Sequence, residues 1–383
     1  MGLQVVNDRW YLYLGPFWDS GVTVLDVTDP TSPELVRWVQ APENTWHFQV
    51  QVADGKMITG LERIEHEVWG LDRSKPSEEG IYVWDVSDAT DPKQLAHWRS
   101  GSPGGTHRNY YDGGRYVHLA AAAPGFHRHI YRILDIADPA NPVEVGRWWL
   151  PEQWLAGGAT PPRPFWSLHG PPYVVGDRAF LAYMNAGMVI LDISDIAVPK
   201  LVSRLDFGEA WGSMIGVHTV LPLPERKLAV VTTESILEDG SRQEPLNFAV
   251  LVDVADETKP RLISWLPVPE PPAGSPLPSF HEKGGRFGPH NLHHFQNNPD
   301  LESRDDRLYL AYFNAGLRVY DIADPYRPRE IAYYIPPDPP VRRGLLPDKL
   351  VTQSEDVLVD RRGYIYVTDK NWGVHILEYT GPE

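Results

Sequence analysis

Short runs of alternating apolar and polar residues recur along the whole chain, and turns containing aspartate and proline follow many of them. A period of two places every second side chain on one face, which is typical of a half-buried β-strand. Turns of this composition join neighbouring strands into hairpins. Patterns long enough for amphipathic helices are scarce, and the sequence therefore predicts an all-β protein.

One segment of this kind returns along the chain, and its last copy is degenerate. It reads GVTVLDVTDPTSPELVRWV from Gly21 and GIYVWDVSDATDPKQLAHW from Gly80. The copies share an acidic residue, which stands at Asp26, Asp85, Asp135, Asp192, Asp253, Asp321 and Glu378. Another strand pair precedes each copy, so each unit is expected to be a four-stranded antiparallel propeller blade. The chain is predicted to be a single seven-bladed β-propeller domain, residues 1–383.

The two ends of this array differ from the other units. The first blade is expected to begin with an inner strand from Leu3 to Val6. The last blade reaches the C-terminus with its third strand and has no evident outer strand. The sequence leaves open how the ring closes.

The GVxVxDVxDPxxPxLVxxW unit resembles that of the LVIVD-repeat proteins and, more distantly, that of the selenium-binding and methanethiol oxidase propellers. The resemblance covers nearly the whole chain and implies the propeller fold. It indicates function only weakly, because propellers with different activities share such units. Similarity to the methanethiol oxidases implies axial histidines that bind copper. The chain has no cysteine, and it departs in this from the cysteine-containing pattern of those oxidases.

Alignment of the blades brings five histidines to the same position at the start of the inner strand. These are His47, His107, His169, His218 and His290, and Glu355 stands at the equivalent position of the last blade. Inner strands surround the axis of a propeller, so the side chains are expected to converge at one end of the central channel. Only 14 histidines occur in the chain, and random placement does not explain this register. The sequence predicts a metal site built from these six residues.

Imidazoles with one carboxylate suit borderline transition metals. Fe(II) is the favoured ion, and Cu, Zn and Mn are alternatives that the spacing does not separate. The seven-bladed carotenoid cleavage oxygenases, which hold Fe(II) with four axial histidines, are similar in architecture without a shared motif. The opposing hypothesis is that the repeat carries histidine for packing and binds no metal.

The other histidines are interpreted differently. Those within strands are predicted to be structural: His97, His118 and His375. Those in or near loops at the histidine end of the channel are interpreted mainly as solvated: His66, His127 and His129. Packing between blades is favoured for His294, while His281 and His293 stay unassigned.

Three carboxylates are expected at the ends of second strands near the histidines: Glu62, Glu234 and Asp369. Carboxylates there can orient imidazoles by accepting their N–H groups, or act as acid–base catalysts. Lys370 and Arg163 are weaker candidates for holding an anionic substrate group.

Four long insertions, residues 62–79, 151–167, 266–289 and 336–353, are expected on the histidine face. They carry aromatic residues that are predicted to form an apolar lid: Trp154, Phe165, Trp166, Phe280 and Phe287. A lid of this kind favours an apolar or aromatic substrate. The alternative is that the loops pack on one another or form a subunit interface.

Composition narrows the function further. The net charge of −16 opposes nucleic acid and anionic membranes as partners. The absence of cysteine excludes disulfides and thiolate ligands. No stretch approaches the ~20 apolar residues of a membrane span and no secretory signal is evident, so a cytoplasmic location is expected if Met1 is the native start. GxGxxG, Walker, GxSxG and HExxH motifs are missing, which weakens nucleotide and serine-hydrolase functions.

These features predict a metal-dependent enzyme, an oxidoreductase of the oxygenase type that acts on an apolar or aromatic small molecule. A lyase or hydrolase at the same site is the first alternative. A propeller that only binds a protein or glycan partner is the second. A metal that merely pins the blades together is the third. The sequence does not indicate the oligomeric state.

Overall fold

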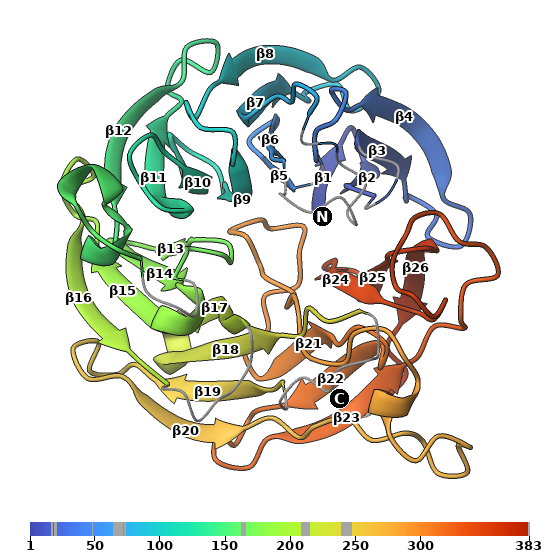
Figure 1. Ribbon diagram of the computed structural model, residues 1–383. Helices are drawn as coiled ribbons and strands as arrows, with labels where there is room; N and C mark the ends of the chain where they lie inside the picture. Colours follow the sequence, from blue (N-terminus) through green and yellow to red (C-terminus); the bar gives the residue numbers. More distant parts are fainter. Residues whose placement is uncertain are drawn as a thin grey trace.

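The computed structural model describes residues 1–16, 18, 21–47, 49–63, 72, 74–161, 166–207, 215–238 and 247–381. Seven antiparallel sheets are arranged as blades around a central axis (Figure 1). The predicted seven-bladed β-propeller is therefore confirmed. Helical structure in the described residues is limited to short 3-10 turns: η2 (Pro151–Gln153), η3 (Leu155–Gly157), η4 (Met184–Ala186), η6 (Pro224–Arg226) and η7 (Phe280–Glu282).

The first four blades have four strands each, in the order of the chain from the channel outward. Blade 1 contains β1 (Gly2–Val6), β2 (Arg9–Leu14), β3 (Gly21–Asp26) and β4 (Glu34–Gln40). Blade 2 contains β5 (Val50–Ala53), β6 (Lys56–Leu61), β7 (Gly80–Asp85) and β8 (Lys93–Trp98). Blade 3 contains β9 (Thr106–Tyr110), β10 (Tyr116–Ala122), β11 (His129–Asp135) and β12 (Val143–Trp148). Blade 4 contains β13 (Tyr173–Val175), β14 (Arg178–Ala182), β15 (Met188–Asp192) and β16 (Lys200–Leu205).

The remaining blades are less uniform. Blade 5 contains β17 (Ile215–Leu223), β18 (Leu228–Glu234), β19 (Ala249–Asp253) and β20 (Arg261–Trp265). Blade 6 contains β21 (Arg307–Ala311), β22 (Leu317–Asp321) and β23 (Arg329–Tyr334). Blade 7 contains β24 (Ser354–Val359), β25 (Tyr364–Asp369) and β26 (Gly373–Glu378).

The two three-stranded blades lack different strands. In blade 6 the inner position is taken by an extended segment that pairs with β21 through the isolated bridge between Leu292 and Leu310. In blade 7 the outer strand is missing from the described residues, as the sequence predicted. Every blade therefore has backbone at its inner edge, where the candidate site residues lie.

The acidic residue of the repeat has a local structural role. In blade 1, Asp26 Oδ1 accepts the backbone N–H of Thr28 at 2.9 Å, and in blade 2, Asp85 Oδ1 accepts that of Ser87 at 2.9 Å. The same bond to the residue two positions on recurs in blades 3 to 6. A carboxylate that satisfies a backbone donor in this way stabilises the turn between the third and fourth strands.

The ring closes by side-chain contacts between blades 7 and 1. A buried cluster joins Leu3 and Leu12 of blade 1 to Leu358 and Tyr366 of blade 7. Arg362 of blade 7 lies 3.9 Å from the centre of the Trp10 ring in blade 1. Apolar packing and a cationic contact thus hold together the two blades at the ends of the chain.

Within the described residues, none of the helices has the length and apolar character that a bilayer crossing requires.

Candidate metal centre

An irregular strand register places three of the six predicted metal-site residues at the channel. His107 lies between Thr106 and Arg108, which pair with the adjacent residues Ala121 and Ala120 of β10. Glu355 is likewise the extra residue between Ser354 and Asp356 in β24, and His218 lies within the register shift of β17. A β-bulge turns a side chain out of the regular alternation, and bulges are frequent beside functional sites.

Backbone hydrogen bonds to the second strand of the blade fix the positions of two other predicted metal-site residues. The N–H of His169 donates to the carbonyl of Ala182 at 2.9 Å, at the end of β14. The N–H of His290 donates to Ala311 at 2.9 Å, at the end of β21. Both imidazoles are thereby held at the inner ends of their blades.

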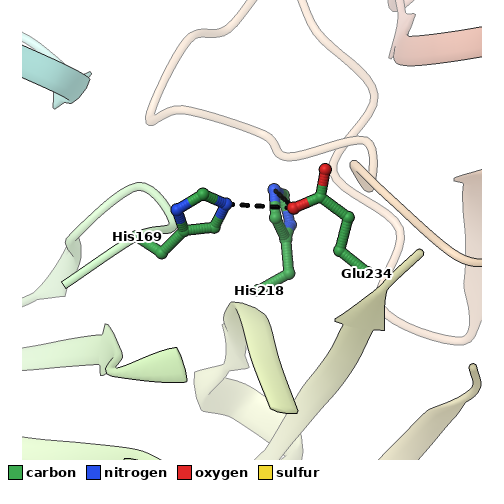
Figure 2. Close-up of side chains that lie close together, drawn as sticks. All are labelled: His169, His218 and Glu234. Atoms are coloured by element: carbon green, nitrogen blue, oxygen red, sulfur yellow. Dashed lines mark hydrogen bonds and ion pairs between the residues drawn. The ribbon is translucent and has the colours of Figure 1, made fainter. Parts of the chain in front are cut away.

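Three side chains form the tightest cluster. His169, His218 and Glu234 each offer a ligand atom, and these atoms lie within 4.8 Å of one another (Figure 2). The Nε2 atom of His169 is 3.0 Å from Glu234 Oε2, and that of His218 is 3.6 Å from the same oxygen. Glu234 is the last residue of β18, so blades 4 and 5 together build this cluster.

His290 and His107 extend the cluster along the ring. The Nε2 atom of His290 lies 3.7 Å from Glu234 Oε1. The ring centres of His107 and His169 are 4.4 Å apart, and those of His218 and His290 are 4.5 Å apart. Four of the five predicted histidines therefore converge, as the sequence indicated.

Hydrogen bonds set the tautomers of two imidazoles so that each carries its lone pair on Nε2. His290 Nδ1 must donate, because its partner is the backbone carbonyl of Glu355 at 2.5 Å, and its Nε2 then carries the lone pair. Arg108 Nη2, which can only donate, lies 3.4 Å from His218 Nε2, so that this nitrogen accepts. His218 Nδ1 then donates to the hydroxyl of Thr219 at 2.8 Å. Such partners fix the tautomer and orientation of a ligand.

Glu234 is held by a buried arginine. Arg286 Nη1 donates to Glu234 Oε1 at 2.8 Å, and Arg286 Nε donates to Glu238 Oε1 at 2.8 Å. Lys370 Nζ donates to the same oxygen of Glu238 at 2.5 Å. Since Arg286 engages Oε1 of Glu234, Oε2 is the oxygen that faces the imidazoles of His169 and His218.

Burial and charge give the histidines and Glu234 of the site different protonation states. Burial lowers the pKa of His107, His218 and His290, which keeps these imidazoles neutral at pH 7. Burial acts to raise the pKa of Glu234, but the positive charge that His218 and His169 carry when protonated, together with the hydrogen bond from His169, outweighs burial and holds that pKa well below its usual range. Neutral imidazoles beside an ionised carboxylate are the protonation states that a transition metal requires of its ligands.

A second carboxylate lies beside this group. Glu62 Oε2 is 2.8 Å from His107 Nδ1, and Glu62 Oε1 is 3.6 Å from His129 Nε2. Burial raises the pKa of Glu62 to about 7. The pKa of Glu62 is thus raised while that of Glu234 is lowered. Such a pair provides one carboxyl group for acid–base chemistry and one carboxylate that stays charged. Glu62 and Glu234 both contact imidazoles, as predicted.

The structure does not bring His47 to the other histidines, so the prediction that His47 is a metal ligand is corrected. Its Nε2 lies 2.6 Å from the hydroxyl of Thr59 in its own blade. Its ring centre is 5.5 Å from that of Tyr82, and burial lowers its pKa to about 4. The backbone pairing of Trp46 with Glu62 leaves the following side chain on the blade interior rather than at the channel.

Glu355 and Asp369 lie beside the cluster without joining it. Glu355 Oε2 is 3.5 Å from His290 Nδ1, and Glu355 Oε1 is 3.4 Å from Lys370 Nζ. Asp369 accepts the Thr352 hydroxyl at 2.7 Å and several backbone N–H groups. These bonds give Asp369 a structural role, and the prediction that it acts in catalysis finds no support in its contacts.

A cavity of about 1250 Å³ opens onto the cluster. His107, His169, Glu234 and His290 line it, whereas His218 is fully buried behind them. Aromatic side chains contribute to its wall: Trp18, Trp38, Trp46, Phe126 and Trp372. The space can hold a small molecule with a large apolar part.

The predicted aromatic lid is wrong in its residues. Phe280 and Phe287 are buried in the core beside blade 6, because the loop that carries them packs inward. Trp166 packs against Arg204, and Trp154 is 47% exposed. None of these four lines the cavity. Phe165, Arg163 and His66 lie outside the described residues.

The remaining histidines mostly match their interpretation. The structural role of His118 is confirmed, since its Nδ1 lies 2.7 Å from the Tyr131 hydroxyl. Packing is confirmed for His294, whose ring centre is 4.4 Å from that of Tyr173. His129, interpreted as solvated, is instead largely buried beside Glu62.

Sequence reasoning missed Arg286, Arg108 and Glu238. Arg286 and Glu238 lie in or beside long loops without a repeated pattern, and no signal in a single sequence places them at the axis. Arg108 had one usable signal, because it directly follows a ring histidine in β9.

Comparisons with known proteins agree with this fold. The chain contains LVIVD repeats, matched by that family over residues 10–40, 131–149 and 173–206. No curated protein matches its sequence. Similar structures include a hypothetical selenium-binding protein from Sulfolobus tokodaii, with 16% identity, a TM-score of 0.60 and coverage of 96% of this chain and 83% of that one. A periplasmic gluconolactonase from Pseudomonas aeruginosa has 11% identity, a TM-score of 0.60 and 97% coverage of both chains. At these identities the likeness shows the propeller fold alone.

Proposed function

We propose that this protein is a metal-dependent enzyme that transforms an apolar small molecule in the axial cavity. The observation that carries the proposal is the buried cluster of His169, His218 and Glu234, with His290 as a further imidazole. Two histidines and one carboxylate with open positions are the ligand set of non-haem Fe(II) oxygenases. We therefore favour an oxidoreductase that binds Fe(II).

The donor set fits such an ion. Burial holds the pKa of His218 and His290 below the usual range, and Arg286 orients the carboxylate of Glu234. Bound Fe(II) would supply redox chemistry and open coordination positions. The chain's own residues position the ligands, surround the substrate with apolar walls and provide Glu62 to take up or release a proton near neutral pH.

A metal-dependent hydrolase or lyase is the second candidate. Glu62 favours it, because a carboxyl group with a pKa of about 7 is matched to proton transfer in either reaction. A similar structure is named a gluconolactonase, and its reaction class belongs to this alternative. Zinc or manganese in place of iron would support the second candidate.

Metal analysis of protein purified without chelators tests the proposal. Wild type is expected to carry stoichiometric transition metal, and His169→Ala, His218→Ala and Glu234→Ala are expected to lose most of it. His97→Ala is the matched control, because His97 lies in the outer strand β8 and contacts the carbonyl of Glu79. Equal metal content in all five proteins would contradict the proposal.

A spectroscopic experiment then separates the two candidates. Protein reconstituted anaerobically with Fe(II) is exposed to nitric oxide and examined by electron paramagnetic resonance. A new high-spin signal is expected if an open coordination position exists, and its absence would argue against an oxygenase. Hydrolysis of simple lactones by zinc-loaded or manganese-loaded protein would favour the hydrolase.

A further inference from the structure

Arg108 lies directly after His107 in β9, and its guanidinium reaches across the channel. Nη1 donates to Gln49 Oε1 of blade 2 at 2.8 Å. Nη2 lies 3.4 Å from His218 Nε2 of blade 5. Arg108 also lines the cavity. A permanent cation is thus placed beside a candidate metal ligand.

The charge of Arg108 is less compensated than that of its neighbours in the cavity. Arg286 is ion-paired with Glu234 and Glu238, and Lys370 with Glu238. Arg108 has no ion pair with a carboxylate among the residues that the structure describes. Its Nε is buried and has no hydrogen-bond partner there. A guanidinium offers five donors, and its planar fork matches a carboxylate.

We propose that Arg108 binds the carboxylate of an apolar small molecule and holds that molecule beside His169, His218 and Glu234. This inference rests on the proposed function and names its substrate class. The aromatic wall of the cavity accommodates the apolar part. A singly charged group fits better than a phosphate dianion, because Glu234 and Glu355 also line the cavity and repel added negative charge.

Metal binding and carboxylate binding are coupled through His218. Its Nε2 lone pair accepts from Arg108 Nη2 in the present structure and is also the pair that a metal would use. A metal ion bound at this nitrogen would take the place of the Arg108 hydrogen bond and leave Nη2 for the substrate. The carboxylate is therefore expected to bind metal-loaded protein more tightly than metal-free protein.

Isothermal titration with benzoate tests the inference on zinc-loaded and metal-free protein. Arg108→Gln is compared with wild type, and benzamide serves as the uncharged probe of similar shape. Arg115→Gln is the control, because Arg115 is exposed and pairs with Asp135 away from the cavity. A charge-assisted hydrogen bond contributes about 1.5–3 kcal/mol, so Arg108→Gln is expected to weaken benzoate binding by roughly 10- to 100-fold.

Benzamide affinity and zinc content are expected to be unchanged in Arg108→Gln, and inorganic phosphate is expected not to displace benzoate. Equal benzoate affinity in wild type and Arg108→Gln, or no benzoate binding to wild type at millimolar concentration, would overturn the inference. Displacement by phosphate would overturn its preference for carboxylates. If benzoate binding requires Arg108 but no metal binds, the proposed function fails while the carboxylate site stands.

Discussion

The Nε2 atom of His169 in blade 4 lies 3.0 Å from Oε2 of Glu234 in blade 5, so one carboxylate links the inner ends of two blades. Oε2 also faces His218, while Oε1 faces His290 and accepts the hydrogen bond from Arg286. Glu234 is therefore the residue around which the site is organised, and the imidazoles differ in how closely they approach it.

His290 and His47 are expected to respond differently to substitution. His290→Ala removes an imidazole 3.7 Å from Glu234 and is expected to lower metal affinity by roughly tenfold or more. His47→Ala is expected to leave affinity unchanged, because His47 bonds Thr59 inside blade 2. Titration against a competing chelator measures both. Equal losses of affinity in the two variants would restore His47 to the metal site.

Arg286 is expected to be essential for stability. Arg286→Met leaves Glu234 without its buried guanidinium partner, and loss of one member of a buried pair costs about 3–5 kcal/mol of the free energy of unfolding. Urea denaturation of the metal-free protein measures this cost without a contribution from ligand binding. Arg304→Met is the control, since Arg304 and Asp306 form an exposed pair that contributes less than ~1 kcal/mol. Similar losses in both variants would contradict the prediction.

The sequence predicted the fold well because its information is local and repeated. Asp26 and its counterparts mark the same turn in successive blades, and alternation marks the strands. The site was predicted in part. Repetition places histidines at equivalent backbone positions, but the direction of each side chain depends on register. His107 lies at a bulge and faces the channel, whereas His47 follows a paired residue and faces its own blade.

Residues outside the repeat could not be placed in this way. Arg286 comes from a long loop, and its position at the axis follows from packing between distant segments. The prediction that the aromatic loop residues cover the cavity failed for the same reason. Phe280 and Phe287 gain more by burial in the core than by covering an open cavity.

His118 is expected to make stability depend on pH. Burial lowers its pKa from 6.5 to about 3, so the folded state disfavours its protonated form. Below pH 6.5 the unfolded chain binds a proton that the folded chain does not, and stability falls until the pH nears 3. At pH 4 this contribution amounts to roughly 3 kcal/mol relative to pH 7.

Denaturation of wild type and His118→Gln from pH 7 to pH 4 isolates that contribution, because the other buried histidines are common to both proteins. The wild type is expected to lose more stability over this interval, even if His118→Gln is less stable at pH 7 through the loss of its contact with Tyr131. Parallel pH profiles would show that His118 titrates normally in the folded state.

Ring closure is expected to depend on Arg362. Its guanidinium donates to the carbonyls of Thr28 and Val27 in blade 1, both at 3.0 Å, and lies over the ring of Trp10. Asp360 of its own blade holds it in place through Oδ2 at 2.7 Å. These contacts add to the apolar cluster that joins blade 7 to blade 1.

Arg362→Ala is expected to lower the free energy of unfolding by about 3 kcal/mol, since hydrogen bonds from a charged donor and a contact with an aromatic face are lost together. Arg304→Ala is the control. Arg304 is 40% exposed and pairs with Asp306 at 2.9 Å, so its removal is expected to cost less than ~1 kcal/mol. Hydrogen exchange should also show faster opening of β1 and β24 in Arg362→Ala, whereas β13 in blade 4, on the opposite side of the ring, should open at the wild-type rate. Equal stability of the two variants would mean that the apolar cluster of Leu3, Leu358 and Tyr366 closes the ring without the cation.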